Sequence, residues 1–130
     1  LVDALLVDRE ADVAPFRTAA RLDDLTLAED ERPALAALTG QEQLAARAVV
    51  WARKEAVLKA TGHGLVVDPS SIVVSAPDVD PALVDWRAAE TAPAAVRLLD
   101  VPLADARHRA AVAVLSDDDV TLTRLGDVLR

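Results

Sequence analysis

The sequence predicts an α/β domain of the α+β kind, in which one long helix packs on a small, mostly antiparallel sheet. The stretch Gln41–Thr61 contains good helix formers and neither Pro nor Gly, so we expect one continuous helix there. The run Ala110–Leu115 is apolar at every position, which is typical of a central strand. We expect residues 1–130 to form a single domain.

The remaining elements follow from local patterns. Gly62 and Gly64 should end the long helix, and a short helix with Pro33 in its first turn should precede it. We expect residues 13–22 to be weakly helical and residues 76–93, which hold three prolines and Trp86, to be irregular. Further strands are expected at residues 2–8, 65–67, 72–75, 96–99 and 120–125, the last after a hairpin turn at residues 117–119.

The composition excludes several classes of function. A net charge of −8 argues against binding to nucleic acid or to anionic membrane surfaces, both of which need a basic footprint. The chain has no cysteine, so it has no disulfide, thiolate metal site or cysteine nucleophile. No apolar run approaches membrane-spanning length, and we expect a cytoplasmic protein.

Positive charge is concentrated in one part of this acidic chain. Between residues 45 and 64 lie Arg47, Arg53, Lys54 and Lys59 against the single acid Glu55. The two lysines are the only ones in the chain, and lysine supplies a compact point charge that arginine does not replace. A locally basic stretch of this kind favours binding of a small phosphorylated ligand.

The same stretch mixes charged and bulky side chains on one side of the expected helix. At about 100° per residue, Trp51, Lys54, Glu55, Lys59 and Gly62 fall within roughly 140° of one another. A structural amphipathic helix would separate these side chains, so the pattern indicates a half-buried face that lines a cleft. The alternative is an ordinary ion pair between Glu55 and Lys59, spaced four residues apart.

Residues 51–65 read W-A-R-K-E-A-V-L-K-A-T-G-H-G-L. This segment closely resembles the W-x-x-K-E-[AS]-x-x-K-x-x-G-x-G-L signature of 4'-phosphopantetheinyl transferases, with weaker similarity at residues 27–35, 66–74 and 109–115. The Trp at position 51 is similar to the surfactin-synthetase-activating type of the family, whereas holo-acyl-carrier-protein synthases usually have Phe at this position. The resemblance, closest to the second half of surfactin-type enzymes, implies a phosphopantetheinyl-transferase-like half-domain. It also implies magnesium-dependent transfer of 4'-phosphopantetheine from coenzyme A to a serine of an acyl or peptidyl carrier protein.

The resemblance assigns roles to the charged residues of the motif. Glu55 would be a magnesium ligand and a base, directly or through water, for the carrier serine. Lys54 would contact the pyrophosphate of coenzyme A, and Lys59 would hold the same phosphates or the departing 3',5'-adenosine bisphosphate. A hard cation on carboxylates with two ammonium groups suits phosphoryl transfer, which needs its charge neutralised and its groups held in line.

The glycines that follow would also belong to the coenzyme A site by this resemblance. Gly62 and Gly64 would allow close approach of the backbone to the ligand, although a plain helix stop explains them equally well. His63 lies between them and is a candidate phosphate contact. His108, flanked by two arginines, fits a solvated surface position better.

Further metal ligands would come from an acidic strand end. Asp8 and Glu10 match the Asp and Glu of the family's Gly-[Ile/Val]-Asp-x-Glu segment, but Leu6 stands where the glycine is expected. An ordinary acidic strand end is the alternative for both. Glu31, in the segment before the motif, is a further candidate ligand.

The chain departs from the surfactin type in length. Surfactin-type enzymes resemble two fused copies of one half, whereas this sequence supplies one copy and has no segment like the family's Ser-His-Ser clamp for phosphate and adenine. Self-association that completes the cleft, a longer parent chain, or a degenerate half would each explain this. The alternative function is a non-catalytic module that binds a carrier protein or coenzyme A. An acidic carrier would need a local basic surface, for which Arg47 and Arg53 are candidates.

Overall fold

The computed structural model describes residues 2–7, 25–104 and 108–123. Its helices are α2 (Arg32–Ala36) and α3 (Gly40–Ala60), with 3-10 turns η3 (Glu29–Glu31), η4 (Gly64–Val66) and η5 (Pro69–Ser71). Its strands are β1 (Val2–Val7), β2 (Ile72–Val74), β3 (Leu83–Trp86), β4 (Arg97–Val101) and β5 (Arg109–Val114). The helix expected at residues 13–22 lies outside the described residues.

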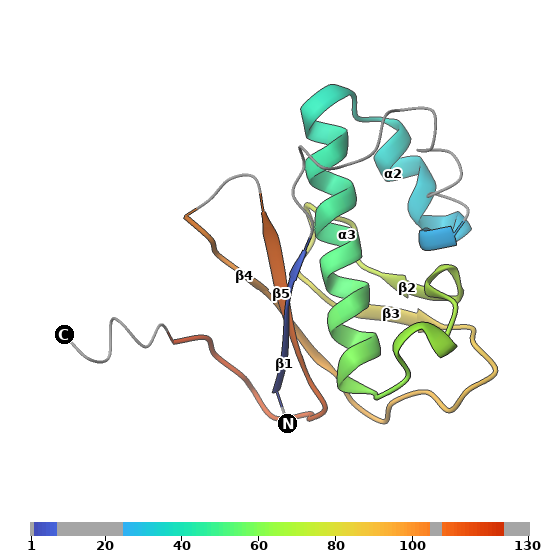
Figure 1. The fold of residues 1–130 in the computed structure, drawn as a ribbon, viewed down its shortest axis with the longest axis vertical. Helices are drawn as coiled ribbons and strands as arrows, with labels where there is room; N and C mark the ends of the chain where they lie inside the picture. The colour runs from blue at the N-terminus through green and yellow to red at the C-terminus, as the bar shows by residue number, and fades with distance from the viewer. Residues whose placement is uncertain (1, 8–24, 105–107, 124–130) are drawn as a thin grey trace.

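The long helix α3 is the axis around which the other elements pack. Figure 1 shows it with the strands β1, β5 and β4 on one side and α2, β2 and β3 on the other. Its end is a Schellman motif, because the amide of Gly62 donates to the carbonyl of Lys59 and the amide of His63 donates to that of Leu58. Gly62 has φ +77°, a left-handed conformation that favours glycine. The prediction that Gly62 stops this helix is confirmed.

The larger sheet has the order β1-β5-β4, and both of its strand pairs are antiparallel. Its central strand β5 is the one that the apolar run predicted, and its residues from Ala111 to Val114 are all buried. One face of this sheet covers α3, which contributes Val50, Val57 and Leu58 to the shared core. The predicted architecture of a long helix on a small antiparallel sheet is therefore confirmed.

The smaller sheet pairs β2 with β3 in antiparallel fashion, with an irregularity between Val73 and Val74. The strand β3 falls inside the stretch that was predicted to be irregular. Pro81 stands just before it, and only four residues are extended, so the local pattern is dominated by the prolines around it. Pairing with β2 supplies the order that the local sequence does not.

Two predicted strands are wrong. Residues 64–66 form a 3-10 turn, because Gly64 has φ +54° and starts a tight turn after the helix stop. The turn leaves Val66 exposed at 77% and Val67 fully buried. Residues 120–123 do not form a strand, so residues 117–119 do not form the predicted hairpin turn; residues 124–125 of the predicted strand lie outside the described residues. No helix in the described part of the chain is long and apolar enough to cross a bilayer.

Candidate functional site

Lys54 lies in the protein interior, with 0% of its surface exposed. Its ammonium is 2.5 Å from Oε1 of Glu31 and donates to the carbonyl oxygens of Thr26 and Pro69, both at 2.8 Å. An ammonium has three donor hydrogens, so these three oxygens satisfy it fully. Burial lowers the pKa of Lys54, and the carboxylate of Glu31 opposes this effect. The structure thus gives Lys54 protein partners, and its predicted contact with a pyrophosphate stays a prediction.

Glu31 is the carboxylate that accompanies Lys54, and it is also buried. Its Oε1 accepts the amide of Ala28 at 2.7 Å, which caps η3, and its Oε2 accepts the amide of Val74 at 2.9 Å. Both oxygens are therefore occupied within the protein. This arrangement differs from the sequence-based hypothesis that Glu31 is a metal ligand, because its position is determined by burial and by two backbone amides.

Arg53 is a second buried cation on α3, exposed at 1%. Its guanidinium forms a two-point ion pair with Asp100 of β4 and donates further bonds to the carbonyls of Ser75, Ala76 and Val79. All of its donor groups are engaged in this way. The suggestion that Arg53 docks an acidic carrier protein is wrong, since the group is enclosed by its own chain.

Glu55 and Lys59 differ from these buried cations. Glu55 is half-buried and Lys59 is exposed. The structure contains no ion pair between them, and neither side chain has a hydrogen-bond partner within the described part of the chain. The alternative of a simple Glu55–Lys59 pair is therefore not what the structure contains. Along the face that was predicted to be half-buried, Lys54 is buried, Glu55 is half-buried and Lys59 is exposed to solvent.

His63 is held in a defined orientation beyond the end of α3. Its Nδ1 lies 2.9 Å from Oγ1 of Thr61, and its ring contacts that of Trp86 with centroids 5.5 Å apart. The Thr61 hydroxyl also lies within hydrogen-bond distance of the carbonyls of Val57 and Leu58, to which it donates its only hydrogen. With the hydroxyl hydrogen directed to those carbonyls, the geometry predicts that Nδ1 of His63 donates to Thr61, which leaves Nε2 for another partner. His63, Lys59 and the exposed Val66 lie at the same end of the helix.

Gly62 and Gly64 both have positive φ, and a Cβ added at either would meet nothing within 4 Å. Within the described chain, their backbone conformation explains them, and the predicted close approach to coenzyme A stays a prediction.

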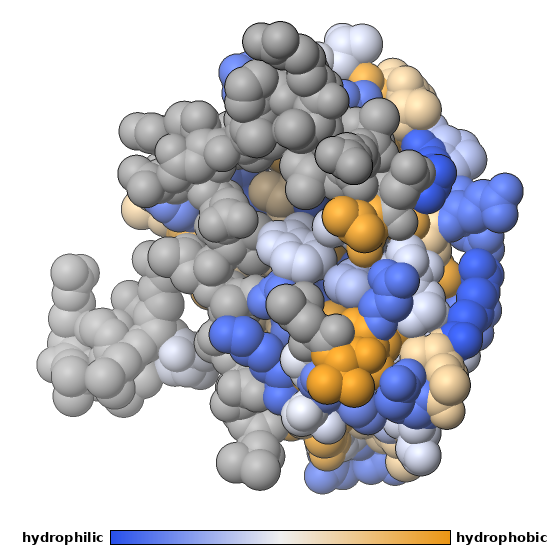
Figure 2. Space-filling view, turned by 45° about the vertical axis from the view of Figure 1, so that its right-hand side comes forward, coloured by the Kyte–Doolittle hydropathy of each residue, from blue (hydrophilic) through white to orange (hydrophobic). Residues whose placement is uncertain are grey.

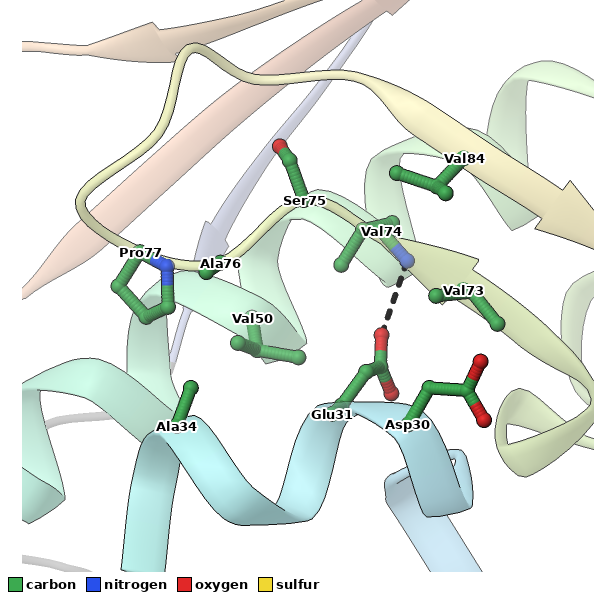
Figure 3. A pocket seen from close by; sticks show the side chains of 10 residues that line it. All are labelled: Asp30, Glu31, Ala34, Val50, Val73, Val74, Ser75, Ala76, Pro77 and Val84. Atoms are coloured by element: carbon green, nitrogen blue, oxygen red, sulfur yellow. Dashed lines mark hydrogen bonds between the residues drawn. The ribbon is translucent and has the colours of Figure 1, made fainter. Parts of the chain in front are cut away.

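A cavity of about 250 Å³ lies elsewhere, between the η3–α2 segment and strand β2 (Figure 3). Its lining is mainly aliphatic, and the hydrogen bond from Val74 to Glu31 crosses its wall. None of the motif residues Lys54, Glu55 and Lys59 lines it. The cavity is thus distinct from the surface that carries Glu55.

The other predicted metal ligands, Asp8 and Glu10, lie outside the described residues. The strand β1, which ends at Val7, packs against α3. Across residues 2–7, 25–104 and 108–123, no three His, Asp or Glu side chains form a group that could hold a metal ion. Of Glu55, Asp8 and Glu10, Glu55 is the one that lies within the described residues.

The surface near η3 carries a separate ion-pair cluster. Arg87 contacts Asp30 at 2.7 Å and Asp85 at 2.8 Å, and all three side chains are exposed. The hydrogen bonds of Arg87 are the largest cause that lowers the pKa of each carboxyl, and the two carboxylates raise the pKa of Arg87 in turn.

The face that Figure 2 turns forward shows hydrophobic residues gathered in its lower half among hydrophilic ones.

Sequence reasoning missed the partners that fix the motif side chains. Asp100, Thr61 and Trp86 carried no signal, because each becomes important only through a contact with a residue of another segment or turn. Glu31 was singled out only as a candidate metal ligand, because Ala28 at the start of η3 is not the Ser or Thr that would signal a capping box.

Comparison with known proteins agrees with this fold. The family model of the 4'-phosphopantetheinyl transferase superfamily matches residues 7–114. A crystal structure of a holo-(acyl-carrier-protein) synthase from Bacillus anthracis str. Ames, in complex with CoA (3',5'-ADP), superposes with a TM-score of 0.68. That match has 21% sequence identity and covers 86% of this chain and 91% of that chain. No protein of curated function matches the sequence significantly.

The fold and the motif helix define a phosphopantetheinyl-transferase-like α+β protein. The family match extends over most of its length, and the chain belongs to the 4'-phosphopantetheinyl transferase superfamily.

Proposed function

We propose that this chain transfers 4'-phosphopantetheine from coenzyme A to a serine of an acyl or peptidyl carrier protein, with Mg²⁺ as cofactor. The observation that carries the proposal is the contrast along α3. Arg53 and Lys54 are fully engaged inside the protein, whereas the carboxylate of Glu55 and the ammonium of Lys59 have no partner in the described chain. In a motif of this family, an ammonium without a partner suits a ligand that carries phosphates, and a carboxylate without a partner suits the Mg²⁺ proposed to accompany them.

The reaction can be written with the residues of this helix. The serine oxygen attacks the phosphorus that bears the pantetheine arm, and the bond from that phosphorus to the bridging oxygen breaks. 3',5'-Adenosine bisphosphate leaves, and the serine proton passes to Glu55, directly or through a water molecule. Lys59 neutralises charge on the phosphates or on the leaving group. Gly62, His63 and Gly64 border the same ligand.

The residues present suit the proposed metal by their chemistry. Magnesium prefers hard oxygen ligands and is held by one or two carboxylates together with waters and substrate phosphates. Glu55 supplies one such carboxylate, and Asp8 and Glu10 are the proposed further ligands. When bound, the ion would neutralise the pyrophosphate charge.

The fold match supports one further part of the proposal. The holo-(acyl-carrier-protein) synthase structure contains CoA (3',5'-ADP), and the present chain spans 91% of that protein. One copy of the fold therefore corresponds to almost all of a synthase chain, and self-association that completes the cleft is part of the proposal. Trp51, by contrast, is the feature that favours the surfactin-synthetase-activating type over the holo-acyl-carrier-protein synthase type. A cytoplasmic location is also part of the proposal.

The experiment is transfer of mass to a carrier protein. Purified chain, Mg²⁺, coenzyme A and an apo carrier protein are incubated, and the carrier is followed by intact-protein mass spectrometry. We expect the carrier to gain one phosphopantetheine and Glu55→Gln to abolish the gain while the fold is retained. If coenzyme A binds but the carrier gains no mass, the chain is the non-catalytic binding module. If Glu55→Gln remains active, Glu55 has no part in the chemistry.

A further inference from the structure

The buried ammonium of Lys54 joins three segments that are distant in sequence. Its partners are Thr26, which precedes η3, Glu31 at the end of η3, and Pro69 at the start of η5. Glu31 extends the network to β2 by accepting the amide of Val74. One side chain of α3 therefore connects the helix to η3, to η5 and, through Glu31, to β2.

Arg53, on the same turn of α3, contacts elements on a different side of the helix. It reaches Asp100 of β4 and the carbonyls of the loop that follows β2. Adjacent helical residues point about 100° apart, so Arg53 and Lys54 together resist rotation of α3 about its axis. Glu55 is the next residue, and its direction follows from theirs.

Burial of a charged side chain in the protein interior costs free energy. Desolvation disfavours the charged form of the ammonium. Apolar side chains of similar volume often stabilise a protein as much as a buried ion pair does, or more. Three oxygen ligands, however, define one position for the nitrogen, which an aliphatic chain cannot do. The arrangement indicates that the position of the helix must be closely defined.

We propose that Lys54, together with Glu31, is a positioning residue that sets the direction of Glu55 and does not touch the substrate. This inference rests on the proposed function, since it concerns how Glu55 is presented to its metal and its substrate. It also gives the motif lysine a role that differs from the pyrophosphate contact implied by the family resemblance.

The test compares Lys54→Met with Glu31→Gln, and uses Arg97→Gln, which removes an exposed cation, as the matched control. Coenzyme A affinity is measured by calorimetry, the half-saturating Mg²⁺ concentration by transfer assays, and the exchange of the Val74 amide by NMR. Supporting groups behind a metal ligand typically change metal affinity or activity 10–100-fold, so we expect a rise of roughly tenfold or more in the Mg²⁺ requirement for both variants. The affinity for coenzyme A should stay within about twofold, and Val74 should exchange faster, because its acceptor is displaced.

Coupling between the variants separates this role from a general loss of stability. If both residues act through one network, the double variant loses little more than either single variant, because each change breaks the same contacts. Should Lys54→Met fail to fold, Glu31→Gln keeps the size of the side chain and carries the test alone. A lower folded fraction would reduce turnover but would leave the Mg²⁺ requirement unchanged, which would overturn the proposal.

Two other outcomes are distinct. If coenzyme A affinity falls tenfold or more in Lys54→Met while Val74 exchange is unchanged, Lys54 contacts the substrate and the positioning role is wrong. If the unmodified chain binds no coenzyme A at all, the proposed function itself fails, whatever the variants do.

Discussion

Arg53 and Asp100 form a two-point ion pair, with Nε 2.9 Å from Oδ1 and an Nη 2.7 Å from Oδ2. The two partners differ in environment, since the side chain of Arg53 is 1% exposed and that of Asp100 is 44% exposed. Water can therefore reach the carboxylate but not most of the guanidinium. The other bonds of Arg53 go to backbone carbonyls, so the residue supports the fold from inside.

This asymmetry predicts unequal losses of stability. Removal of Asp100 by Asp100→Ala should lower the free energy of unfolding by about 1–2 kcal/mol, because water can replace part of the lost acceptor. Arg53→Ala should cost about 3–5 kcal/mol, because it leaves buried carbonyls unpaired and opens space in the interior. Urea unfolding measures both, and the exposed Arg97→Gln should change stability by only about 0–1 kcal/mol. Equal losses for Arg53 and Asp100 would contradict this assignment.

The contrast between these residues explains which features of the fold and the site could be predicted from the sequence. The helix α3 and the central strand β5 were predictable because their patterns are local and long enough to dominate. The angular argument placed Lys54, Glu55 and Lys59 on one face, which is correct as geometry. It could not distinguish them, because burial depends on what packs against each part of that face.

The partners of Lys54 illustrate the same point. Thr26 and Pro69 are 28 and 15 residues away in sequence, and each contributes only a backbone carbonyl. A carbonyl belongs to every residue type, so no sequence pattern can identify one as a ligand. The strand β3 was missed for a related reason, since its order comes from pairing with β2.

The Arg87 cluster predicts a dependence of stability on acid. The pKa values of Asp30 and Asp85 lie below the ordinary value of 3.8, mainly because Arg87 donates a hydrogen bond to each carboxylate. The folded state thus binds fewer protons than the unfolded state just below pH 3.8, so the stabilisation is complete above that pH and is lost as pH falls through the lowered values.

We therefore expect Arg87→Gln to be less stable than the unmodified chain near neutral pH and the difference to shrink in acid. Urea unfolding across a series of pH values at low ionic strength measures it, and added salt should reduce the difference because the side chains are exposed. A difference that grows on acidification would show that these ion pairs do not stabilise the fold.

His63 should have a fixed tautomer. In the neutral ring Nδ1 carries the proton, because Thr61 Oγ1 gives its own hydrogen to the helix carbonyls and can only accept from His63. The ¹⁵N chemical shifts of the two ring nitrogens, measured at alkaline pH, report this directly. Thr61→Val keeps the shape of the side chain but removes the acceptor, and should restore a mixture of tautomers. An Nε2-protonated ring in the unmodified chain would contradict the geometry.

Lys59 should be the motif cation that contacts phosphate, since it is exposed while Lys54 and Arg53 are enclosed. Loss of a hydrogen bond to a charged group costs about 1.5–3 kcal/mol, so Lys59→Gln should weaken binding of coenzyme A by roughly 10–100-fold. Lys59→Arg keeps the charge and should lose less, although the planar fork does not reproduce a compact ammonium. Calorimetry with coenzyme A and with 3',5'-adenosine bisphosphate separates contact with the shared phosphates from contact with the pantetheine side.

The salt dependence of the same measurement tests whether charge is the cause. Binding by the unmodified chain should weaken as salt is added, because an exposed ammonium is screened, and Lys59→Gln should show a smaller dependence. Arg97→Gln removes a cation from β4 and should leave affinity and salt dependence unchanged. If Lys59→Gln binds both ligands as tightly as the unmodified chain, the phosphates must lie away from the exposed side of α3.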